Sequence, residues 1–164
     1  MSANNRYRPH VMILPEDDAN RQLANGFVSH ALIASRSVQV LPSAGGWPRV
    51  RDEFREVHAA EMQQNPFRWM VLLVDFDEKA SRLDEVKIAI PDSLADRVFI
   101  IGVWSVPEHL RKYGLPAKEE FAQSLANECY ENRRELWNHH LLKHNAGELD
   151  RMTLALRPIL FPPV

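Results

Sequence analysis

Cysteine, glycine and long apolar stretches are all scarce in this chain of 164 residues. Cys129 is the only cysteine, which excludes an internal disulfide and a zinc site built from four cysteines. No apolar run approaches the roughly 20 residues that a membrane-spanning helix needs, so no membrane association is expected. Residues 1–10, MSANNRYRPH, have no apolar stretch after a basic start, and therefore no secretion signal is expected. A cytoplasmic location follows as the expectation.

An excess of basic residues is also missing. The chain has 20 Lys and Arg against 22 Asp and Glu, a formal net charge of −2. Proteins that hold nucleic acid through its phosphates usually carry a visible basic excess. A nucleic-acid surface on this protein must therefore be local, or be completed by bound cations.

Apolar runs alternate with segments of helical periodicity over the first two-thirds of the chain. The runs predict strands over 10–14, 37–41, 69–74 and 97–103, with helices between them over 19–33, 47–64 and 82–90. Nearly continuous apolar strands separated by helices are typical of a parallel sheet covered on both faces. The expected fold is α/β: a three-layer, Rossmann-like domain with a mostly parallel sheet of four or five strands.

The last third of the chain has a different pattern. Amphipathic periodicity predicts helices over 117–130, 132–142 and 147–156. We expect an N-terminal tail (1–8), an α/β domain (9–115) and a helical extension (116–164) that packs on the same domain. These C-terminal helices are also the expected surface for a protein partner or for a homo-oligomer.

Acidic residues directly follow two of the predicted strands. Glu16 comes just after the first strand, and Asp75 and Asp77 come just after the third. Ligand sites of open α/β sheets lie beyond the carboxyl ends of the strands. If the chain stays extended, Asp75 and Asp77 point the same way. Carboxylates brought together need a cation, and Mg²⁺ or Mn²⁺ is the expected one.

These segments resemble the TOPRIM domain, found in topoisomerases, bacterial primases and small nucleases. The matching pieces are VMILPEDDAN, VQVLPSAGGWPRV and VLLVDFDEK, followed by the strand RVFIIGV. The resemblance implies metal-dependent cleavage or transfer at phosphodiesters of DNA or RNA. It further implies that Glu16 is the general acid/base or a metal contact, and that Asp75 and Asp77 are metal ligands. The family often has Glu-Gly after its first strand, whereas Asp17 follows Glu16 here.

The same acids also resemble the phosphorylation site of a response-regulator receiver. In that interpretation Asp75 accepts the phosphoryl group, and Asp17 and Asp18 hold the metal. No lysine follows an apolar fifth strand, so the cation expected to contact the phosphoryl group has no candidate. Asp17 either caps the next helix or adds a metal ligand. Glu108, just beyond the fourth strand, is a further candidate ligand or starts a helix behind Pro107.

A glycine pair, Gly45-Gly46, lies between the second strand and the next helix. Glycine allows the backbone to approach phosphate closely, and it also allows a tight turn. Arg49 and Arg51 follow and are the candidates for contacting a phosphate backbone, unless they are solvated helix charges.

Three histidines gather near the C-terminus. His140 and His144 are four residues apart and would share one face of a helix, while His139 would point elsewhere. The spacing lacks the adjacent glutamate of the zincin pattern, and the role of the three stays open.

Three functions are therefore compatible with the sequence. The preferred one is a TOPRIM-like, divalent-metal-dependent nuclease or another enzyme acting on phosphodiesters. The second is a non-catalytic interaction protein of the same fold, or a subunit of a larger complex. The third is a receiver-like phosphoacceptor domain.

Overall fold

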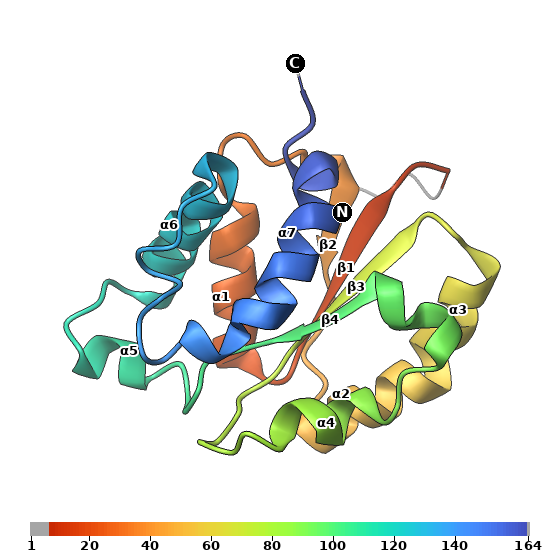
Figure 1. Ribbon diagram of the computed structural model, residues 1–164, viewed down its shortest axis with the longest axis horizontal. Coiled ribbons are helices and arrows are strands. Elements are labelled where there is room, and N and C mark those ends of the chain that lie inside the picture. The colour runs from red at the N-terminus through yellow and green to blue at the C-terminus, as the bar shows by residue number, and fades with distance from the viewer. Residues whose placement is uncertain (1–6, 164) are drawn as a thin grey trace.

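A four-stranded sheet with helices on both faces forms the centre of the computed structural model, which describes residues 7–163 (Figure 1). The strands are β1 (His10–Pro15), β2 (Val38–Val40), β3 (Arg68–Leu73) and β4 (Val98–Ile101). The helices are α1 (Asp18–Val28), α2 (Trp47–Glu53), α3 (Ala59–Gln64), α4 (Arg82–Lys87), α5 (His109–Lys112), α6 (Lys118–Glu131) and α7 (Ala146–Leu160). Short 3-10 helices span Ser35–Ser37, Asp92–Arg97 and Lys143–Asn145, and a π-helical turn at Phe54–His58 joins α2 to α3. None of the described helices has the length and hydropathy to cross a membrane.

All four strands are parallel, in the order β2-β1-β3-β4. β1 lies inside the sheet, and each of its six residues is buried. Val11 pairs with Val38 on one side and with Trp69 on the other. This burial on both faces explains why the strands are continuous apolar runs and not alternating ones. The predicted α/β fold class with a parallel sheet is confirmed.

Alternate residues of the strands enter two separate cores. Val11 and Ile13 of β1 face the layer formed by α1, α6 and α7. Met12 and Leu14 face the opposite layer, formed by α2, α3 and α4. Figure 1 shows these two helical layers on either side of the sheet. Because successive side chains of each strand point to opposite faces of the sheet, both faces are apolar and both are covered by helices. This produces the three-layer arrangement.

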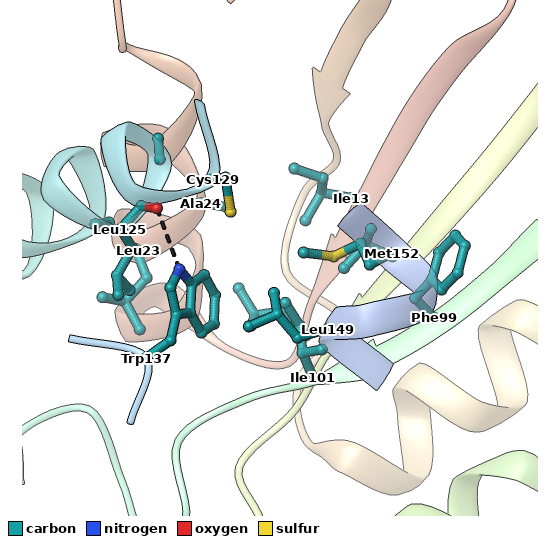
Figure 2. Packing of buried hydrophobic residues seen from close by; sticks show 14 of the residues in the cluster. Ile13, Leu23, Ala24, Phe99, Ile101, Leu125, Cys129, Trp137, Leu149 and Met152 are labelled. Carbon is teal, nitrogen blue, oxygen red and sulfur yellow. Dashed lines mark hydrogen bonds between the residues drawn. The ribbon is translucent and has the colours of Figure 1, made fainter. Parts of the chain in front are cut away.

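Helices α6 and α7 complete the first of these layers. α6 runs against α1 so closely that a Cβ on Gly26 would lie 2.3 Å from the Glu119 carbonyl oxygen. α7 packs over the sheet, and Figure 2 shows its Leu149 and Met152 between the strands and Trp137. The described part of residues 116–164 thus supplies a large share of the hydrophobic core.

The predicted helix over 132–142 is wrong, because this segment consists of turns. α6 ends at Glu131, and its C-cap residue Asn132 has a left-handed backbone (φ 57°). The buried carboxylate of Glu128 then accepts hydrogen bonds from the backbone N–H groups of Leu136 and Trp137. The spacing of apolar residues cannot reveal that a preceding side chain will form hydrogen bonds with these backbone N–H groups.

Several helix ends also differ from the prediction. The first helix ends at Val28 and not near residue 33, and the short helix over 82–90 ends at Lys87. The last helix, predicted over 147–156, continues to Leu160 and contains Pro158. Leu156 and Leu160 are both buried in the core, and this burial keeps the final turn helical despite the proline.

Candidate metal site at the ends of β1 and β3

The strand order makes the carboxyl ends of β1 and β3 the switch point of the sheet. The helix after β1 covers one face of the sheet, whereas the helices after β2 cover the other. β2 is added on one side of β1, whereas β3 and β4 are added on the other, so the order in which strands join the sheet reverses between β1 and β3. Ligands bind at such positions in open α/β sheets. Pro15 pairs with Leu73 at this end, and the Glu16 N–H donates to the Leu73 carbonyl at 2.9 Å. Glu16 and Asp75 consequently emerge beside each other.

Three carboxylates converge there. One oxygen from each of Glu16, Asp17 and Asp75 lies within 4.8 Å of the other two. Glu16 and Asp75 are buried, and Asp17 is half-buried at the N-cap of α1. Asp17 was expected either to cap this helix or to join the acids, and it does both. Its Oδ1 accepts from the Asn20 backbone N–H at 2.9 Å.

Hydrogen bonds hold the three acids in place. Glu16 Oε2 accepts from the Asp75 backbone N–H at 2.6 Å, and Glu16 Oε1 accepts from the Trp47 backbone N–H at 3.0 Å. The side-chain amide of Asn20, which is fully buried, donates to Asp17 Oδ1 at 2.9 Å and to Asp75 Oδ1 at 3.0 Å. The Oδ1 atom of Asn20 is buried and has no hydrogen-bond partner.

Electrostatic repulsion and burial both act on this cluster. Burial, assisted by the charges of Glu16, Asp17 and Asp77, raises the pKa of Asp75 to about 7, although the Asn20 hydrogen bond opposes the shift. Burial also raises the pKa of Glu16, and the neighbouring carboxylates of Asp17 and Asp77 add to it. Ionised carboxylates are thus disfavoured here in the absence of a compensating cation.

Asp77 does not belong to the cluster. Asp75 and Asp77 would point the same way only on an extended chain, and this condition is not met, because Asp77 has a left-handed backbone with φ 49°. Its carboxylate instead forms an ion pair with Arg82, with 2.7 Å between Oδ2 and Nη1. The alternation along β3 therefore stops before this residue.

Arg82 is the important residue that sequence reasoning missed. It is only 2% exposed, and its Nη1 donates both to Asp77 and to the backbone carbonyl of Asp75. Its guanidinium lies 4.4 Å from the ring centroid of Trp47. In the sequence it is merely the first residue of a short helix, and nothing in that pattern reveals its burial.

The glycine pair forms hydrogen bonds with the backbone of Glu16. The N–H groups of Gly45 and Gly46 both donate to the Glu16 carbonyl, at 2.8 and 3.1 Å, with φ values of 98° and 123°. The pair thus forms the tight turn that was one of its two expected roles. Arg49 is exposed next to this turn, whereas Arg51 pairs with Asp52.

The remaining candidates lie outside the cluster. Among the described residues, Glu108 is exposed just before α5 and is not one of the three converging acids. The predicted helix face with His140 and His144 is wrong, because residues 132–142 form turns. His139 and His140 contact the Tyr113 ring.

His144 lies instead against the loop that follows β3. Its ring centroid is 4.4 Å from that of Phe76 and 5.2 Å from that of Trp104. Burial among these rings lowers the pKa of His144 to about 4, so this histidine is neutral at physiological pH.

A divalent cation fits the groups present at the cluster. The donors are carboxylate oxygens, which Mg²⁺ and Mn²⁺ prefer. A cation would offset both the burial and the added repulsion that raise the pKa of Asp75. The buried amide oxygen of Asn20 adds an acceptor without a partner beside Asp17 and Asp75. Comparisons of this chain with protein-family models, with curated proteins and with solved structures find no match.

Proposed function

We propose that this protein binds Mg²⁺ or Mn²⁺ through Glu16, Asp17 and Asp75, and that it acts on phosphodiesters as a TOPRIM-like nuclease or a related enzyme. The observation that carries the proposal is the convergence of these three carboxylates at the switch point between β1 and β3. Their substrate would be a nucleic acid, either DNA or RNA. Asp77, the third acid of the TOPRIM-like pattern, would contribute only if its ion pair with Arg82 broke.

The chemistry follows from the groups at hand. A bound divalent cation polarises a phosphoryl oxygen and lowers the pKa of a coordinated water. Burial raises the pKa of Glu16 above that of an ordinary glutamate, and a raised pKa favours a role in proton transfer. Because both of its oxygens accept backbone N–H groups, Glu16 also fixes the loops before Trp47 and Asp75. The exposed guanidinium of Arg49 beside the glycine turn is the candidate contact for a phosphate backbone.

A two-part experiment tests this function. Thermal melting with EDTA, Mg²⁺ or Mn²⁺ measures cation binding, and incubation with labelled single- and double-stranded DNA and RNA measures cleavage. We expect Mn²⁺ to raise the melting temperature and to permit cleavage by the wild type. Asp75→Asn should remove both effects. Asp18→Asn is the matched control, because Asp18 follows Asp17 in sequence but is exposed and bonded to Arg21.

Two outcomes would refute the nuclease. If Mn²⁺ stabilises the wild type but no nucleic acid is cut, the site binds a cation without this activity. If neither effect occurs, the cation site is refuted as well, and a non-catalytic interaction protein is the proposal that remains.

A receiver-like phosphoacceptor is the second candidate, and the position of Asp17 favours it. Two consecutive acids after β1 and one acid after β3 form the cluster. This arrangement resembles the acid pair and aspartate of a receiver, whose expected pair here was Asp17 and Asp18. Asp18, the other expected metal ligand, bonds to Arg21 and Gln22 instead, so Glu16 would replace it. Incubation with acetyl phosphate and Mg²⁺ followed by intact-mass measurement distinguishes the two functions. A receiver gains one phosphoryl group at Asp75, whereas a nuclease gains none.

A further inference from the structure

We propose that Arg82 withholds Asp77 from the cation site of Glu16, Asp17 and Asp75, and that this ion pair thereby limits the affinity of the site for divalent cations. The inference rests on the proposed function, because it assumes that the three carboxylates bind a cation. The inference assigns a role to Arg82, which lies outside the acidic cluster: it limits the number of carboxylates that can bind the cation.

One guanidinium nitrogen joins both aspartates of the loop after β3. Arg82 Nη1 donates to Asp77 Oδ2 and to the Asp75 backbone carbonyl, each at 2.7 Å. Asp75 contributes its side chain to the cluster, while Asp77, two residues later, is directed to Arg82. The same arginine therefore anchors the loop and occupies the carboxylate of Asp77.

The position of Arg82 is itself strongly determined. Its side chain is 3% exposed and stacks 4.4 Å from the centroid of Trp47, and Glu85 lies 3.8 Å from its Nε. An arginine cannot lose its charge at any ordinary pH, so a buried guanidinium without a carboxylate partner lowers the stability of the fold. Asp77 is that close partner, and releasing it to a cation would leave the buried charge poorly compensated.

The backbone of the loop is also held in an uncommon conformation. Asp77 and Glu78 are consecutive non-glycine residues with left-handed φ values of 49° and 60°. The Glu78 N–H donates to the Trp104 carbonyl at 2.7 Å and helps to keep this conformation. An extended backbone at residue 77 would return Asp77 to the side of Asp75. The ion pair between Asp77 and Arg82 opposes such a change of the loop backbone.

Mn²⁺ affinity, measured on the full chain by electron paramagnetic resonance of free Mn²⁺, tests the proposal. Arg82→Gln should bind Mn²⁺ about tenfold more tightly than the wild type, whereas Asp77→Asn alone should change the affinity less than about twofold. In the Asp77→Asn background, Arg82→Gln should tighten binding by less than about threefold. Lys79→Gln, which removes an exposed positive charge from the same loop, is the matched control and should also have an effect below about threefold.

The double variant separates two explanations of tighter binding. Loss of a nearby positive charge would act equally in both backgrounds, but release of Asp77 requires a carboxylate at position 77. An equal gain in both backgrounds, or no gain from Arg82→Gln, overturns the proposal.

A second measurement on the wild type covers the case in which Arg82→Gln does not fold. The side-chain carboxyl ¹³C resonances of Asp75 and Asp77 are followed by NMR during a Mg²⁺ titration. We expect the Asp75 resonance to shift and the Asp77 resonance to stay in place, and parallel shifts would overturn the proposal. If neither resonance shifts and no variant binds Mn²⁺, the proposed function fails, and the proposal fails with it.

Discussion

Replacing Asp75 by asparagine should stabilise the metal-free protein at pH 8. Asparagine has almost the same shape, and its amide oxygen can still accept the hydrogen bond that Asn20 donates at 3.0 Å. The substitution removes one negative charge from a buried position beside Glu16 and Asp17. The wild type should thus be less stable than its own variant, as expected where a binding site concentrates like charges.

The size of the effect follows from the pKa of Asp75. It is about 7 in the folded protein against 3.8 for an ordinary aspartate, and at about 1.4 kcal/mol per unit the difference amounts to at most about 4 kcal/mol. Between roughly pH 4 and pH 7 the folded state holds a proton that the unfolded state has lost. The free energy of unfolding of the wild type therefore falls as the pH rises through this window. Above pH 7 the full destabilisation is present.

Urea unfolding of both proteins in EDTA, followed by tryptophan fluorescence at pH 4 and pH 8, measures this difference. At pH 8 we expect Asp75→Asn to be more stable by about 2–4 kcal/mol, or roughly 5–15 °C in melting temperature. At pH 4 the two proteins should be nearly equal, because Asp75 is protonated in the folded wild type. Asp18→Asn, which removes an exposed charge directly after Asp17, should show no comparable gain. A variant that is no more stable than the wild type at pH 8 would refute the argument that the carboxylates need a cation.

Two further predictions concern packing and the loop after α6. Gly102→Ala should destabilise the protein by more than about 3 kcal/mol in urea unfolding, because its Cβ would lie 1.6 Å from the Val74 carbonyl oxygen. Gly147→Ala is the control, because no atom outside its chain neighbours and its own helix backbone lies within 4 Å of a Cβ there; its stability should be unchanged or higher by up to about 1 kcal/mol. Glu128→Gln should cost about 1–3 kcal/mol by the same measurement, because the buried carboxylate accepts the backbone N–H groups of the next loop. Exposed Glu131→Gln should change stability by less than about 1 kcal/mol, and equal losses in the two variants would contradict the role given to Glu128.

The strands and the position of the acids were readable from residue order. The apolar runs at residues 10–14 and 69–74 correspond to β1 and β3, because burial on both faces leaves little room for polar residues. Parallel strands end at one edge of a sheet, so residues that follow two neighbouring strands meet there. For this reason the meeting of Glu16 and Asp75 could be predicted from their places in the chain.

The membership of the cluster depended on contacts between distant segments. Asp17 joins it and Asp77 leaves it, because a buried arginine from the next helix captures Asp77 and the backbone turns left-handed there. The helix expected after α6 is absent for a similar reason, since Glu128 binds the backbone that the helix would have used. Local periodicity reports which residues are apolar. It does not report which charged side chain pairs with which partner in the interior, because those pairs form only when distant segments pack together.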